Sequence, residues 1–379
     1  MPESREKTFQ SARVLGGLFL GVGALSFIAS FAMLETPAWG AFIASYIYFL
    51  GLTEGALVLG ITFTFIRGTW SRTLYPLGGA LTVSFFPLAV LMMLVIIASQ
   101  GSIFYWADGS AHNMWLDPTF FTIRNLVVVP IVYLFGWLVF KNSLETTDPE
   151  RDEKHQVRWG RLAVPFVLLF ALHQGILSYD LGMTMTHHWV NTIFPPAFLV
   201  TSLRTALAGL VVVMFILRQR FKVNFVDSQF RNLGHLTLGL TIVWFYFQWC
   251  MFYPVWYANI PEGTEGLYLR IFNPEWMWTF ALMMVFGGVI PFLMLVFHRT
   301  RRSVSLMVTV SSIILVGLWV ERFLVAMPPL AEDHKSAHVA VFGFTNLTFG
   351  LGVLGAAILL FLAVAKRFPK VIAGEPSEG

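Results

Sequence analysis

Residues 74–99, LYPLGGALTVSFFPLAVLMMLVIIAS, contain no charged side chain and decide the fold class. A helix of about 20 residues crosses a hydrocarbon core roughly 30 Å thick, because each residue adds about 1.5 Å. Similar runs recur along all 379 residues, and the chain is 56% hydrophobic and 12% charged. An average soluble domain is about 25% charged. The sequence therefore predicts an all-α fold, a polytopic integral membrane helical bundle.

About ten spans divide the chain, and we expect them to form a single transmembrane domain, residues 1–379. The first span carries no small-residue cleavage site and is followed almost at once by another. We therefore expect a permanent helix there and not a signal peptide. The predicted spans lie near residues 14–34, 38–66, 74–99, 119–141, 161–180, 190–217, 233–257, 273–298, 303–326 and 340–366.

The positions of Lys and Arg predict the orientation, since basic loops stay on the cytoplasmic side. Of the 25 basic residues, 20 fall at one set of span ends, and only Arg270 and Lys335 lie in the opposite loops. Arg124, Arg204 and Arg322 lie inside spans. Both termini are thus expected in the cytoplasm. The net charge of +4 reflects orientation in the lipid bilayer and does not indicate nucleic acid.

Cys250 is the only cysteine, which excludes an internal disulfide, a four-cysteine iron–sulfur cluster and a C-x-x-C-H haem attachment. A haem b core would need paired histidines on facing helices, and of the nine histidines only His173 lies clearly within a span. We therefore expect no bound metal, and any redox metal to sit on a partner subunit.

Polar side chains within the spans are the strongest functional signal, because ionisable groups are costly in lipid and need a function or a partner. One interpretation is structural: Glu54 would pair with Arg204, and Glu321 with Arg124. The other is a polar cavity that opens outward, with a protonatable step deeper in the membrane. The polar residues within spans are Glu54, Arg124, Asn125, His173, Gln174, Asp180, Arg204, Glu321 and Arg322.

Two segments carry a family resemblance. The first is SYDLGMTMTHHWVNTIF, residues 178–194, and the second is WYANIPE, residues 256–262, followed by Tyr268-Leu269-Arg270. Together they resemble the polysulfide-reductase membrane subunits, also called NrfD-like. Within that family they are most similar to the ActF-type subunit of alternative complex III, a bacterial quinol oxidoreductase. The ten predicted spans agree, so the resemblance covers nearly the whole chain.

The resemblance implies a helical subunit, without a catalytic metal of its own, in a quinol-linked respiratory or photosynthetic electron-transfer complex. Its extracytoplasmic face would dock an iron–sulfur protein, with a quinone site nearby and a polar path for protons. Iron–sulfur clusters and haems would sit on partners, including multihaem cytochrome c subunits and a homologous membrane subunit. The expected ligand is a non-covalently bound quinone such as menaquinone. Three residues depart from the motifs of this subtype: His187 stands where Pro is expected, Pro195 where Gly is expected, and Gly263 where an acidic residue is expected. These differences alter loop conformation more than chemistry.

Site residues follow from these two lines of reasoning. His173 and Asp180 are seven residues apart and share a helix face, about 10 Å from each other. Quinol releases two protons on oxidation, which carboxylates and imidazoles can accept. The catalytic candidates are Glu54, His173, Asp180, Arg204, Glu321 and Arg322. The cofactor-binding candidates are Arg124, Asn125, His188, Trp189, Trp256 and Asn259.

Other interpretations of these residues are open. His188 and Trp189 can form an ordinary interfacial turn, and Asn259 can stabilise a loop through its own main chain; a docking surface for a partner is the preferred alternative for both loops. A second possibility is a stand-alone secondary transporter for a small anion or a proton-coupled solute, in which Arg204 and Arg322 would suit an anion site. A third possibility is a structural membrane anchor without its own quinone site.

Overall fold

All regular structure in the described part of the chain is helical, which confirms the predicted fold class. The computed structural model describes residues 2–32, 36–66, 73–109, 113–145, 153–187, 189–258, 264, 266–333 and 343–373. Within these residues, ten segments are long and apolar enough to cross a membrane.

The membrane-spanning segments are joined by short helical pieces. The α-helices are α1 (Pro2–Ala32), α2 (Thr36–Phe65), α3 (Leu74–Ala98), α4 (Gln100–Ile103), α5 (Pro118–Glu145), α6 (Glu153–Asp180), α7 (Phe194–Arg220), α8 (Asp227–Ala258), α10 (Met277–Leu282), α11 (Ile290–Val296), α12 (His298–Arg302), α13 (Val304–Asp333), α14 (Phe344–Arg367) and α15 (Lys370–Ala373). The 3-10 helices are η2 (Tyr105–Asp108), η3 (Met114–Leu116) and η4 (Met183–Met185), and the π-helices are η5 (Tyr268–Phe272) and η6 (Met283–Val289).

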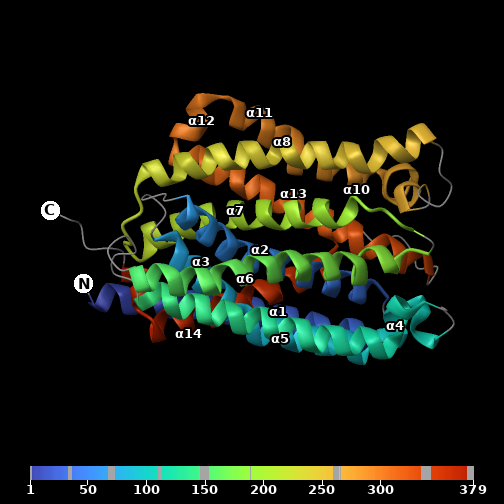
Figure 1. The fold of residues 1–379 in the computed structure, drawn as a ribbon, viewed down its shortest axis with the longest axis horizontal. Helices are drawn as coiled ribbons and strands as arrows, with labels where there is room; N and C mark the ends of the chain where they lie inside the picture. Colours follow the sequence, from blue (N-terminus) through green and yellow to red (C-terminus); the bar gives the residue numbers. More distant parts are fainter. Residues whose placement is uncertain are drawn as a thin grey trace.

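The long helices lie side by side along the long axis of the molecule, and α1 begins at the same end at which α14 finishes (Figure 1). Helix α2 is the centre of the bundle and packs against α3, α7, α13 and α14. Its spanning segment is 94% buried, whereas those of α1 and α8 are 17% buried. A helix that is apolar on all sides is expected at such a central position.

Helix α1 attaches to the bundle mainly through α14. The two helices cross at Gly23 and Gly352, where neither position has room for a Cβ atom. Small residues allow helix backbones to approach closely in a membrane, where van der Waals packing drives association. The glycines of the first and last spans therefore bring the two ends of the chain together.

The eighth predicted span, 273–298, is not one regular helix. It consists of α10, the π-helix η6 and α11, followed by the short helix α12. Gly317 of α13 has no room for a Cβ against Gly287 of η6, so these two backbones are in close contact. Pro291 has no amide hydrogen for the carbonyl of Gly287 four residues earlier, which favours an interruption of the regular helical pattern here.

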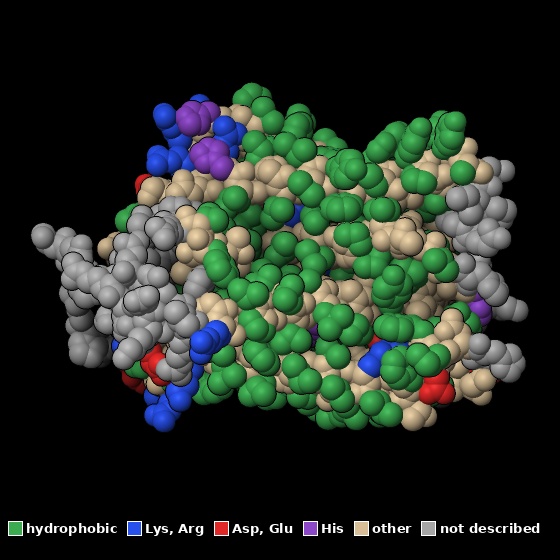
Figure 2. Space-filling model, in the orientation of Figure 1, with side chains coloured by type: hydrophobic (Ala, Val, Ile, Leu, Met, Phe, Trp, Pro, Cys, Tyr) green, Lys and Arg blue, Asp and Glu red, His purple; other side chains and the backbone are tan. Residues whose placement is uncertain are grey.

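The surface is divided as the membrane requires. Figure 2 shows hydrophobic side chains over the middle of the visible face, with Lys and Arg gathered mostly at the end where α1 begins. The basic last turns of α7 and α14 lie at that end. Which side of the membrane this end faces stays a prediction from the distribution of basic residues.

Candidate functional site

A chain of buried polar side chains crosses the centre of the bundle. Glu54 of α2 is completely buried, and both of its oxygens face His173 Nδ1 on α6, at 3.1 and 3.2 Å. Gln174 Nε2 donates to Glu54 Oε2 at 3.2 Å. Adjacent residues on α6 thus hold one carboxylate from two sides. The Nδ1 atom of His173 must carry its proton to donate here, while its buried Nε2 has no hydrogen-bond partner among the described residues.

The same chain continues to α7 and α13. Ser202 Oγ donates to Gln174 Oε1 at 2.7 Å, and Arg322 Nη2 donates to Ser202 Oγ at 2.8 Å. Arg322 also donates to the carbonyl of Phe198 at 2.9 Å and lies over that phenyl ring. We call the series Arg322–Ser202–Gln174–Glu54–His173 the polar chain. It connects four helices, which explains how these polar groups are buried with partners.

Glu321 lies next to the polar chain and ends in a cavity. Its oxygens accept hydrogen bonds from Thr201 Oγ1 at 2.8 Å and from Trp244 Nε1 at 2.9 Å. Gln248 Nε2 approaches Glu321 Oε1 at 3.5 Å. Since α13 continues to Asp333, beyond the predicted end at 326, Glu321 lies nearer the middle of its helix than the sequence predicted.

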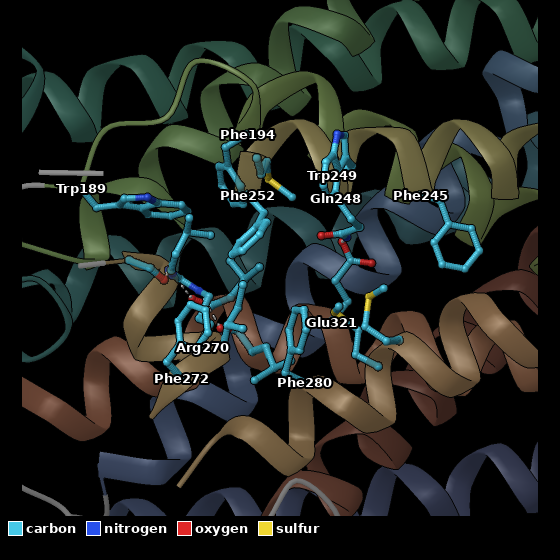
Figure 3. A pocket seen from close by; sticks show the side chains of 18 residues that line it. Trp189, Phe194, Phe245, Gln248, Trp249, Phe252, Arg270, Phe272, Phe280 and Glu321 are labelled. Atoms are coloured by element: carbon cyan, nitrogen blue, oxygen red, sulfur yellow. Dashed lines mark hydrogen bonds between the residues drawn. The ribbon is translucent and has the colours of Figure 1, made fainter. Parts of the chain in front are cut away.

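The cavity has a volume of about 580 Å³ and lies between α8, η5, α10, η6 and α13. Its walls are mostly Phe, Met, Leu and Trp side chains. Figure 3 shows Trp189 and Arg270 near one another, and Glu321 and Gln248 pointing toward each other elsewhere along the wall. The cavity therefore combines apolar walls with a few placed polar groups, as is typical of small-molecule sites.

The cavity also reaches the outside of the bundle. Trp249 of α8 and Phe272 of η5 line it, yet both side chains are more than half exposed. Trp189 Nε1 is buried and has no hydrogen-bond partner among the described residues. A ligand could thus enter from the apolar surface between α8 and η5.

Arg270 is fixed in the cavity wall by two prolines of α13. Pro328 and Pro329 have no amide hydrogen, so the carbonyls four residues earlier, Leu324 and Val325, lose their helical donors. Arg270 donates to these two carbonyls at 3.0 and 3.4 Å. Arg270 lies outside the predicted spans, and burial lowers its pKa to about 10, so that it remains protonated at neutral pH.

Arg204 does not pair with Glu54, contrary to the pairing considered above. It is completely buried, and Nη2 donates to Thr241 Oγ1 at 3.2 Å and to the Gly287 carbonyl at 2.6 Å. That carbonyl belongs to the π-helix η6. The guanidinium also lies 4.8 Å from the centre of the Trp244 ring, whose indole nitrogen donates to Glu321. Arg204 therefore belongs to the α8 side of the site, and Trp244 lies between its guanidinium and Glu321 in this series of contacts.

Asp180 accepts a separate set of hydrogen bonds from α5 and η3, which we call the Asp180 clamp. Arg124 belongs to this clamp and does not pair with Glu321. Arg124 donates to both oxygens of Asp180, at 2.9 and 2.6 Å. Asn125 Nδ2 and Trp115 Nε1 add hydrogen bonds of 2.8 and 3.0 Å. With four donors on two oxygens, Asp180 is occupied by structural contacts. Arg124 and Asn125, whose binding of a cofactor stays a prediction, fasten α5 to α6 in the structure. No contact among the described residues links Asp180 to His173.

The remaining predicted residues divide into three groups. Trp189 lines the cavity. Trp256 is 63% exposed and is not a lining residue, although it packs on Phe252, which lines the cavity. His188 and Asn259 lie outside the described residues.

Sequence reasoning missed the neutral members of the site. Uncharged side chains give no clear functional signal within an apolar span, and the members missed for this reason are Ser202, Thr201, Trp244 and Gln248. Gln174, next to His173 on the same helix, was named among the polar residues within spans but not among the site candidates. In the described ranges, no three His, Cys, Asp or Glu side chains are close enough together to hold a metal ion.

These features define a polytopic helical membrane protein with an internal polar network and an apolar ligand cavity. The sequence profile of the family described as "Polysulphide reductase, NrfD" matches residues 29–331, and the chain belongs to this family of membrane subunits of redox complexes. A putative membrane subunit of a dimethyl sulfoxide reductase from Halobacterium salinarum is 22% identical over 332 residues, which cover 79% of this chain and 72% of the relative.

Proposed function

We propose that this chain handles quinol and protons for an electron-transfer complex of the alternative complex III type. Quinol enters the cavity from the membrane and its two electrons pass to clusters on a docked iron–sulfur partner. The observation that carries this proposal is the position of Glu321, which faces the cavity while its neighbour Arg322 belongs to the polar chain.

The cavity fits the chemistry of a quinol. Apolar walls suit the ring, and the opening between α8 and η5 leaves space for a hydrophobic tail. A quinol hydroxyl both donates and accepts a hydrogen bond. Glu321 can accept the hydroxyl proton, while Gln248 can donate to oxygen. No metal is required within this chain for those contacts.

Oxidation of the quinol breaks two O–H bonds and releases two electrons and two protons. Glu321 is the first proton acceptor, because its carboxylate lies in the cavity wall. Deeper in the bundle, Glu54 and His173 form a pair in which one proton can move between carboxylate and imidazole. Ser202 and Gln174 hold this pair and link it to Arg322.

The electrons need a partner, since the chain offers no redox metal site in its described part. The relative from Halobacterium is named as a membrane subunit of a reductase, which supports a similar place in a complex. The ActF-like segments at residues 178–194 and 256–262 favour an extracytoplasmic iron–sulfur protein, multihaem cytochrome c subunits and a homologous membrane subunit as partners. The complex would then sit in a bacterial cell inner membrane.

The test is the substitution Glu321→Gln in the purified complex. We expect quinol oxidation to fall by about a hundredfold or more, the usual effect of losing a general base. Affinity for a quinone analogue should change little, because Gln keeps the shape and one acceptor oxygen. Glu6→Gln, an exposed carboxylate at the other end of the bundle, is the control. Wild-type turnover in the Glu321 variant would contradict the proposal.

A second candidate is proton conduction without a quinone site in this chain. It is favoured by the polar chain, whose members are linked to one another without any ligand in the cavity. In that case Glu321→Gln would leave quinol oxidation unchanged. Binding of a labelled quinone analogue to the complex would also be unaffected by a bulky substitution in the cavity wall, such as Met283→Trp. Proton movement would still depend on Glu54.

A further inference from the structure

A basic cluster lies at the end of the molecule opposite to the cavity. It is formed by two elements: Arg231 and His235 in the first turns of α8, and the short helix α12, His298–Arg302, which contains three arginines. Figure 2 shows Lys, Arg and His side chains gathered over the place where Figure 1 shows α12 beside the start of α8. We call this group the α8–α12 cluster.

The two elements of the cluster are packed together. A Cβ atom added at Gly234 would lie 3.6 Å from the Cβ of Arg301, which places α12 against the first turns of α8. Arg231, Arg301 and His298 are close enough to His235 for their charges to act on it. Arg301 is fixed by hydrogen bonds to the carbonyls of Leu295 and Val296, and its buried Nε has no partner among the described residues.

The acid nearest to the cluster in sequence is Asp227, four residues before Arg231 on α8. None of the four arginines or two histidines of the cluster makes an ion pair with a described residue. Asp227 is paired with Arg218, which lies in the last turn of α7 outside the cluster. Arg231, Arg299 and Arg302 are exposed. Four guanidinium groups on two packed elements, none of them in an ion pair with a described acid, attract an anion with several acceptor oxygens, and a phosphate group supplies these.

The apolar surface beside the cluster decides the type of anion. Leu293, Val296 and Phe297 precede α12 directly and are 55%, 48% and 66% exposed, and Leu236 of α8 is also exposed. A soluble anion would make no use of these side chains. A phospholipid would place its phosphate on the arginines and its acyl chains along the apolar residues.

We propose that the α8–α12 cluster binds the headgroup of an anionic phospholipid. The bound lipid lies in the leaflet that faces the ends of α7 and α14. There it joins α8, which is among the least buried spans, to the interrupted eighth span through α12. The site does not depend on quinol binding, because it lies at the opposite end of α8 from the cavity residues Gln248 and Trp249.

Native mass spectrometry of the full chain, delipidated and offered phosphatidylglycerol or phosphatidylcholine, tests this proposal. We expect the wild type to retain phosphatidylglycerol preferentially. The double variant Arg299→Gln/Arg302→Gln should bind it roughly twenty-five-fold more weakly, since one basic residue near a lipid surface contributes a factor of about five. Arg231→Gln, on the other element, should weaken binding about fivefold.

The matched control is Lys366→Gln/Arg367→Gln, which removes two exposed basic residues from the end of α14. This control should keep the wild-type affinity. Equal loss in both double variants would indicate general attraction to a basic surface and would overturn the proposal. Equal retention of the two lipids by the wild type would do the same. Displacement of the lipid by millimolar inorganic phosphate would assign the cluster to a free anion instead.

Discussion

At the scale of single residues, the contacts of Glu54 and Asp180 differ in a way that separates two roles. Asp180 receives four hydrogen bonds, two of them from the guanidinium of Arg124. Glu54 receives its contacts from an imidazole and an amide, and no arginine touches it. A carboxylate held by a guanidinium has little freedom to exchange protons, whereas one beside histidine has a titratable partner.

The role of Glu54 can be tested with Glu54→Gln. Gln keeps the size of the side chain and can still contact Gln174, but it cannot take up or release a proton. We expect proton translocation in proteoliposomes to fall at least tenfold, while complex assembly stays intact. Translocation by this variant at the wild-type rate would exclude Glu54 from the proton path.

The clamp at Asp180 predicts a loss of stability and a rescue. Arg124→Met leaves a buried carboxylate unpaired, which should lower the free energy of unfolding by about 3–5 kcal/mol. Adding Asp180→Leu removes the unpaired charge and should recover most of that loss. Thermal unfolding in detergent measures both effects. If the single variant were as stable as the wild type, the pair would have no structural importance.

At the scale of elements, the interruptions of helices determine where the buried arginines lie. Pro328 and Pro329 free two carbonyls of α13 for Arg270, and the carbonyl of Gly287 in η6 is bound by Arg204. Each guanidinium thus stabilises a point at which the regular helical hydrogen bonds are incomplete. This arrangement holds η5 against α13 and shapes one wall of the cavity.

A rescue experiment tests the link between Arg270 and the two prolines. Arg270→Met leaves the carbonyls of Leu324 and Val325 without donors, which should cost about 1–3 kcal/mol for each carbonyl that water does not reach. Pro328→Ala/Pro329→Ala restores the amide donors, so the triple variant should be more stable than Arg270→Met alone. The alanine substitutions alone, with Arg270 present, are the control. A triple variant no more stable than the single one would refute the link.

These elements also show what sequence could and could not predict. Long apolar runs predicted the ten spans because length and hydropathy are local properties. The partners of Glu54 and Glu321 depend on which helices are neighbours, which no local pattern records. The charges alone favoured Glu54 with Arg204, but in the structure Arg204 donates to a carbonyl of η6. A π-helix has no strong sequence signal, so this acceptor could not be anticipated.

At the scale of the whole molecule, the even number of spans places the start of α1 and the end of α14 at the same end of the bundle, close to most of the basic residues. The distribution of Lys and Arg predicts that this end faces the cytoplasm. The cavity would then open near the opposite face, where the proposed iron–sulfur partner docks.

Cysteine labelling in intact cells tests this orientation. In a Cys250→Ser background, Glu6→Cys and Arg367→Cys should react with a membrane-impermeant maleimide only after the cells are opened. Met114→Cys, an exposed position at the other end of the bundle, should react from outside. The reverse pattern would place the cavity on the cytoplasmic side and would contradict docking of an extracytoplasmic partner.

Glu321 and Arg322 are consecutive residues on one long helix, yet they serve different neighbours. The carboxylate faces the cavity, and the guanidinium contacts Ser202 and the carbonyl of Phe198. Because α13 is continuous from Val304 to Asp333, a rotation of this helix that displaces one of the two side chains must displace the other. A ligand that rotated α13 on reaching Glu321 would therefore also change the contact of Arg322 with Ser202, so that an event in the cavity would alter the polar chain.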